Sequence, residues 1–123
     1  MRFGFMEDFR NPVKWRRPFP EFYEQILEQI VRGEELGYDN VWLTEHHFTD
    51  DGYNPSLMTT AAAVAARTGT IRIGTFVLLL PYQHPVLIAE EIANVDIFSN
   101  GRFDFGIGQG YSYHEFKAFC MGS

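Results

Sequence analysis

The chain has 123 residues, a net charge of −6, a hydrophobic fraction of 46% and a charged fraction of 21%. These values are ordinary for one small globular domain, and the acidic balance argues against binding to nucleic acid or to an anionic membrane surface. The single cysteine, Cys120, cannot form an internal disulfide and has no basic neighbour, so we assign it no role. There is also no secretion signal and no apolar run of membrane length, so we expect a cytoplasmic protein.

Strand-like and helix-like segments alternate from the start of the chain. Residues 2–7 form a short aromatic strand, and apolar residues then recur about every four positions from Phe22 until Gly37 ends a helix. A second strand is predicted over residues 40–45.

The second half of the chain continues this alternation. Asn54 is the expected N-cap of a helix whose first residue is Pro55 and which Gly69 closes. A strand follows over residues 71–80. The last two predicted elements are a helix from Pro85 to Ser99 and a strand over residues 103–108.

Such alternation is typical of βαβ units and a parallel sheet. Two folds compete: a small doubly wound sheet, one strand short, and the first half of a (β/α)₈ barrel of about 250 residues. The run over residues 59–66 has almost no polar face, so both of its sides should be covered. This favours the half-barrel and fits a subunit interface, although a short buried helix would also explain it.

Titratable residues lie at the end of the second strand, as Glu45, His46 and His47. Because side chains alternate along a strand, His46 shares a face with Trp42, and His47 points elsewhere. Adjacent histidines chelate one metal poorly and the HExxH spacing is absent, so no metal site is predicted. His46, at a strand end, is a candidate general base, whereas His47 reads better as a loop or core residue.

Glycines at alternate positions mark the end of the last strand, at Gly106, Gly108 and Gly110. They would let a ligand approach the backbone closely, although glycines also form ordinary turns. The pattern is GxGxG and differs from the dinucleotide fingerprint GxGxxG.

Four stretches together resemble the bacterial luciferase-like flavin monooxygenases, a (β/α)₈-barrel family. They are residues 41–49, Gly74-Thr75 with Leu80-Pro81, residues 84–86 and residues 99–107. The match runs in order over nearly the whole chain. It implies a TIM barrel of the luciferase-like type, of which residues 1–123 supply the N-terminal half, about four βα units.

The resemblance also implies roles for individual residues. His46 corresponds to the family's catalytic histidine, beside the reactive face of the flavin. The Phe76–Val77 bond matches a non-proline cis peptide held against the flavin ring. The remaining expected contacts are Thr75, Gly108, Gln109 and Gly110 for the cofactor, and Met6 and Glu45 for the substrate pocket.

Two positions depart from the luciferase catalytic subunit. Gly108 stands where that subunit has a reactive cysteine, and Gln109 where it has a phosphate-facing arginine. We therefore expect no light emission. The family's other phosphate contacts lie in the second half of the barrel.

The implied activity is oxidation of a small organic substrate by dioxygen and reduced FMN, which a flavin reductase would supply. A homodimer formed through the second and third helices is expected, with Glu90 and His47 near the interface. Two alternatives stay open: a deazaflavin-dependent oxidoreductase of the same superfamily, and a non-catalytic half-barrel or assembly subunit.

Overall fold

The computed structural model describes residues 1–119, so Cys120 lies outside the described residues. The strands are β1 (Gly4–Glu7), β2 (Asn40–Leu43), β3 (Arg72–Thr75), β4 (Leu78–Leu79), β5 (Phe103–Asp104) and β6 (Ile107–Gly108). The α-helices are α1 (Phe19–Glu35), α2 (Leu57–Arg67), α3 (Pro85–Ser99) and α4 (Tyr113–Phe119), with 3₁₀ turns at Val13–Trp15 and Leu80–Tyr82.

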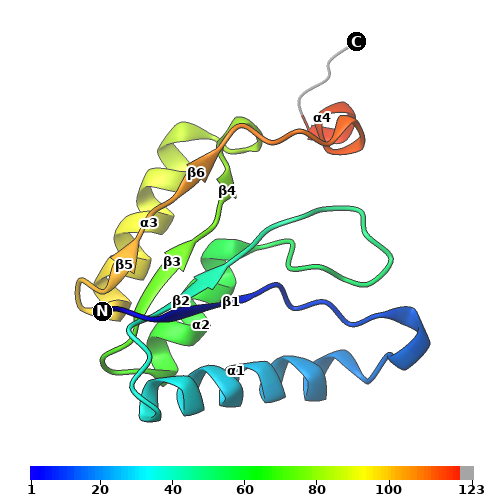
Figure 1. Ribbon diagram of the computed structural model, residues 1–123. Coiled ribbons are helices and arrows are strands. Elements are labelled where there is room, and N and C mark those ends of the chain that lie inside the picture. Colours follow the sequence, from blue (N-terminus) through cyan, green and yellow to red (C-terminus); the bar gives the residue numbers. More distant parts are fainter. Residues whose placement is uncertain (120–123) are drawn as a thin grey trace.

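The main sheet is parallel throughout, with strands in the order β1-β2-β3-β5. Strands that neighbour each other in chain order, joined by right-handed crossovers, place every connecting helix on the same side of the sheet. Figure 1 shows α1 below the strands and α2 and α3 behind them, with no helix in front of the main sheet. This is a partial barrel, as predicted, and differs from a doubly wound sheet, which has helices on both faces.

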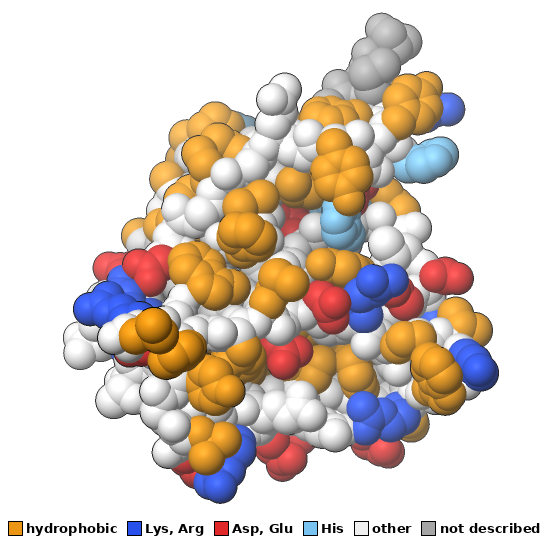
Figure 2. Space-filling view, in the orientation of Figure 1, with side chains coloured by type: hydrophobic (Ala, Val, Ile, Leu, Met, Phe, Trp, Pro, Cys, Tyr) orange, Lys and Arg blue, Asp and Glu red, His pale blue; other side chains and the backbone are white. Residues whose placement is uncertain are grey.

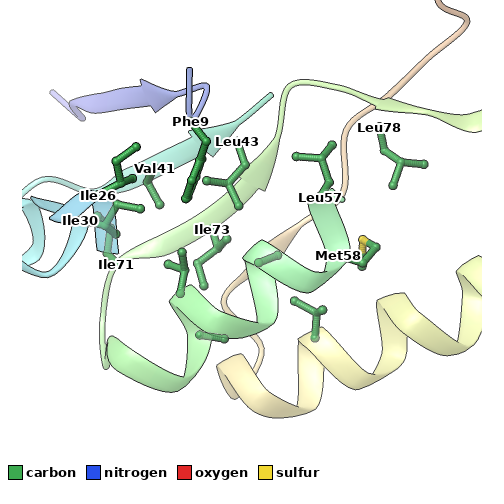
Figure 3. Close-up of a cluster of buried hydrophobic side chains, with 14 of the residues drawn as sticks. Phe9, Ile26, Ile30, Val41, Leu43, Leu57, Met58, Ile71, Ile73 and Leu78 are labelled. Atoms are coloured by element: carbon green, nitrogen blue, oxygen red, sulfur yellow. The ribbon is translucent and has the colours of Figure 1, made fainter. Parts of the chain in front are cut away.

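The core fills the space between the sheet and the helices (Figure 3). Val41, Leu43 and Ile73 alternate toward the helices along β2 and β3, and all three are fully buried. They pack with the apolar stripe of α1 that the sequence predicted, which includes Ile26 and Ile30. Each such side chain stabilises the fold by roughly 1.5–3 kcal/mol.

The predicted strand over residues 71–80 is interrupted in the structure. β3 ends at Thr75 and β4 begins at Leu78, and the Phe76–Val77 peptide between them is cis, as predicted. The predicted strand over residues 103–108 is likewise split into β5 and β6. The Thr75 hydroxyl donates to the Gly106 carbonyl at 2.7 Å and accepts from the Gly106 N–H at 2.9 Å, so a side chain replaces strand pairing here.

The predicted start of the second helix was wrong. α2 begins at Leu57, and no side chain caps its first turn. Asn54 is buried two residues before the cap position, where its amide donates to Thr60 Oγ1 at 3.0 Å and its Oδ1 accepts from the Ser56 N–H at 3.3 Å. It therefore holds the segment that leads into the helix.

Smaller differences concern the ends of elements. β1 starts at Gly4 and β2 stops at Leu43, each two residues inside the predicted range, and α1 begins three residues early, at Phe19. α4 was not predicted at all. None of the described helices is long and apolar enough to span a membrane.

Candidate active site

The carboxyl ends of the strands carry a hollow of about 270 Å³. Its lining residues are Met6, Thr44, Glu45, His46, Tyr53, Phe76, Val77, Leu79 and Tyr111. Most of these side chains are apolar or aromatic, and Phe76 and Met6 are 61% and 58% exposed. Figure 2 shows hydrophobic side chains across the uncovered face of the sheet, with a histidine among them. The hollow is close to the lower end of pockets that bind small ligands, about 300–1,000 Å³.

The imidazole ring of His46 is held in this hollow by contacts on several sides. Its Nδ1 lies 3.0 Å from Glu115 Oε1, and its backbone N–H donates to the Asn54 carbonyl at 3.2 Å. Tyr53 and Tyr111 contact the imidazole edge to face, at centroid distances of 5.0 and 5.7 Å. The Tyr111 hydroxyl lies 3.4 Å from Nε2. The ring is thus fixed in orientation, with its side chain still 27% exposed.

His47 points into different surroundings, as the strand alternation predicted. It lines a second hollow, of about 330 Å³, beside Met58 and Tyr82. Its Nε2 lies 2.7 Å from Glu45 Oε1, and Glu45 Oε2 accepts the Leu79 N–H at 3.0 Å. Glu45 therefore ties the end of β2 to β4.

A larger hollow, of about 860 Å³, lies at the other end of the strands. It is lined by polar residues that include Glu34 and the Arg72–Asp104 ion pair. Parallel barrels carry their chemistry at the carboxyl ends of the strands, so this hollow is not a candidate active site. Among the described residues, no group of three or more His, Cys, Asp or Glu side chains is placed to hold a metal ion.

Comparison with known proteins decides the family of this fold and site. The family described as luciferase-like monooxygenase matches residues 1–122. The chain belongs to this family.

A curated member is the alkanal monooxygenase alpha chain of Photobacterium phosphoreum, which is 33% identical over 123 residues. The match covers 97% of this chain and 33% of that protein. The chain thus spans a quarter to a third of the length of the curated relatives that it matches.

Several solved structures share the fold. Monooxygenase RslO1 from Streptomyces bottropensis is 34% identical with a TM-score of 0.88, over 97% of this chain and 36% of that one. The oxygenating constituent of 3,6-diketocamphane monooxygenase from Pseudomonas putida, solved in complex with FMN, is 23% identical with a TM-score of 0.87, over 98% and 33%. The coenzyme F420 dependent tetrahydromethanopterin reductase of Methanopyrus kandleri is 24% identical with a TM-score of 0.72, over 95% and 29%.

The structure brings together only part of the site predicted from the luciferase-like resemblance. Met6, Glu45, His46, Phe76 and Val77 line the same hollow. The other four predicted residues lie outside its lining. Thr75 is fully buried against Gly106, Gly108 pairs with Leu79 between β6 and β4, Gln109 is exposed, and Gly110 turns the chain with φ +79°.

Gly108 also has a packing role between β6 and the preceding strand segment. A Cβ at this position would lie 2.4 Å from Val77 Cγ2. Glycine therefore lets β6 approach the Phe76–Val77 segment closely.

Sequence reasoning missed Tyr53, Tyr111 and Glu115 of this luciferase-like site. Each reaches His46 from a segment outside the predicted strands and helices. The one available signal was the spacing of Phe116 and Phe119, which marks an apolar side of a short helix and would place α4 against the strand ends.

Proposed function

We propose that this chain forms the N-terminal half of a flavin-dependent monooxygenase barrel, with His46 as its proton-transfer group. The observation that carries the proposal is the placement of an oriented imidazole in a mostly apolar hollow at the carboxyl ends of parallel strands. Membership of the luciferase-like monooxygenase family supports the reaction class.

The residues of the hollow suit a flat, largely apolar ring such as the flavin isoalloxazine. Phe76, Val77 and Leu79 form an apolar wall, and Met6 faces the same space from β1. When bound, reduced FMN supplies the electrons that activate dioxygen. The wall residues would hold the ring and exclude water.

His46 acts at its Nε2 atom in this proposal. Its Nδ1 is engaged by Glu115, so Nε2 is the nitrogen that exchanges protons with groups in the hollow. An imidazole suits this role because it can both accept and donate a proton in general acid–base catalysis.

The experiment that tests the reaction is turnover in ¹⁸O₂ with reduced FMN and a panel of small aldehydes and ketones. One labelled oxygen atom in the product, found by mass spectrometry, is the expected result. His46→Ala should lower the rate about 10²–10⁴-fold if His46 exchanges the proton. An unchanged rate in a folded variant would remove His46 from the mechanism.

Changing the cofactor in the turnover assay, and titrating the chain with each cofactor, separates the two alternative functions. A deazaflavin in place of FMN is an alternative cofactor, because an F420-dependent reductase shares the fold. Hydride transfer from reduced deazaflavin without oxygen incorporation would support that reading. Binding of neither cofactor in an equilibrium titration would support a non-catalytic half-barrel.

Two partners belong to the proposal. A flavin reductase would supply reduced FMN, as the resemblance to luciferase-like monooxygenases implies. A second copy of the chain would pack on α2 and α3, since α3 exposes Val86, Leu87, Ile97 and Phe98 and also carries the exposed Glu90.

A further inference from the structure

Glu115 is a buried carboxylate beside His46 that the sequence analysis assigned no role. It lies on α4 and is 2% exposed. Its Oε1 atom lies 3.0 Å from His46 Nδ1 and accepts the backbone N–H of His47 at 2.8 Å. Its Oε2 atom is buried and has no hydrogen-bond donor among the described residues.

This geometry determines which imidazole nitrogen carries the proton. An ionised carboxylate is only an acceptor, so a hydrogen bond between Oε1 and Nδ1 requires a proton on Nδ1. Neutral His46 then has its lone pair on Nε2, the nitrogen beside the Tyr111 hydroxyl at the hollow. The backbone N–H of His47 fixes Oε1 from a second direction, so the carboxylate cannot turn away without losing that bond.

We propose that Glu115 is a positioning residue that sets the tautomer and orientation of His46, so that Nε2 is the proton acceptor. The inference deepens the proposed function and rests on it for its catalytic meaning. A carboxylate that orients the base is a recurrent part of active sites with an imidazole.

His47 provides an internal contrast. Its Nε2 pairs with Glu45, so its neutral form should carry the proton on Nε2. The two adjacent histidines are thus held in opposite tautomers by two different buried glutamates. A merely structural role for Glu115, anchoring α4 to the strand ends, would require no particular tautomer of His46.

The test is ¹⁵N NMR of the imidazole nitrogens in the purified chain, at about pH 8.5 where free imidazole is neutral. The chain has four histidines, and the His46→Gln variant identifies the His46 signals by their loss. The expected result is a protonated Nδ1 and an unprotonated Nε2 in His46, and the reverse in His47. A proton on Nε2 of neutral His46 in the wild-type chain overturns the proposal without any need for a Glu115 variant.

Variants then assign the effect to Glu115. Glu115→Leu removes the acceptor and should lose the Nδ1–H signature of His46, whereas Glu115→Gln keeps an acceptor oxygen and should retain it. Glu45→Gln is the matched control and should leave the His46 signals unchanged. A folded Glu115→Leu chain that still holds the proton on Nδ1 also overturns the proposal. Because no flavin or substrate is present, a failed turnover assay and a failed tautomer assignment remain distinct results.

Discussion

Glu7 ends β1 with a partly buried carboxyl group next to Asp8. Burial, and in second place the negative charge of Asp8, raise the pKa of Glu7 from 4.5 to about 7. Its backbone carbonyl accepts the Thr44 N–H at 3.2 Å, so the strand pairing does not depend on the side chain. The folded state therefore prefers the protonated form of this side chain.

A raised carboxyl pKa makes stability depend on pH in a defined direction. The contribution of Glu7 is fully present below about pH 4.5 and is lost as the pH rises toward 7, because the folded state binds the proton more tightly than the unfolded state. Glu7→Gln should reduce this loss of stability. Urea unfolding at pH 5 and pH 7.5 measures the change in the free energy of unfolding of each protein. The same change in the wild-type and variant proteins would show that Glu7 is not responsible.

Asp51 affects the pH dependence of stability in the opposite direction and in a different pH range. Burial tends to raise its pKa, but hydrogen bonds from Arg10, Thr49 and the Tyr53 backbone outweigh burial and lower it below 3.8. Its contribution is present above that value and is lost in acid. The two pH ranges do not overlap, so the Glu7 measurement is not confounded by Asp51.

Arg102 joins elements that are distant in the sequence. Its guanidinium donates to the carbonyls of Ala65 and Thr68 at the end of α2, to the Ile71 carbonyl before β3, and to the Ser99 carbonyl at the end of α3. Carbonyls at a helix end have no partner within the helix, and here one charged side chain satisfies several of them.

Replacing Arg102 should therefore destabilise the fold more than replacing an exposed arginine. Arg102→Met should cost about 1.5–3 kcal/mol, because buried carbonyls lose a charged donor. Arg67→Met is the matched control, since Arg67 pairs with Glu24 at the surface, where an ion pair contributes about 0–1 kcal/mol. Urea denaturation measures the free energy of unfolding of both variants. Equal losses for the two variants would contradict a bridging role for Arg102.

The sequence predicted those elements whose signals are local. α3 runs from Pro85 to Ser99, as predicted, because proline opens it and Asn100 ends it in a left-handed conformation. The break between β3 and β4 was not predicted, because the family resemblance supplied only the cis peptide at Phe76–Val77. Apolar periodicity cannot show that Thr75 interrupts a strand by bonding to Gly106, 31 residues away.

For the candidate site, the sequence predicted the residues at the end of the second strand. Glu45 and His46 come two and three residues after the end of β2, so their placement at the strand ends follows from the parallel topology alone. Glu115 reaches His46 across 69 residues of sequence. That contact depends on how the chain turns after β6, where Gly110 takes a positive φ. No local pattern carries this information.

At the scale of the whole molecule, the partial barrel leaves two kinds of apolar surface exposed. One is the uncovered sheet face with Met6 and Phe76, and the other is the outer side of α3 with Leu87 and Phe98. Phe98 also lines a shallow groove between α2 and α3, beside Met58 and Ala62. Apolar surfaces of this kind drive association.

We expect the 123-residue chain to associate through α2 and α3 at micromolar concentration, because Phe98 is 62% exposed beside the groove of the neighbouring helix. Sedimentation velocity should show a dimer or larger species for the wild-type chain. Phe98→Glu should shift it toward monomer, and Phe76→Glu, on the sheet face, is the matched control that should not. The opposite pattern would place the contact on the open sheet and indicate pairing of two half-barrels. A folded wild-type monomer would contradict association by either surface.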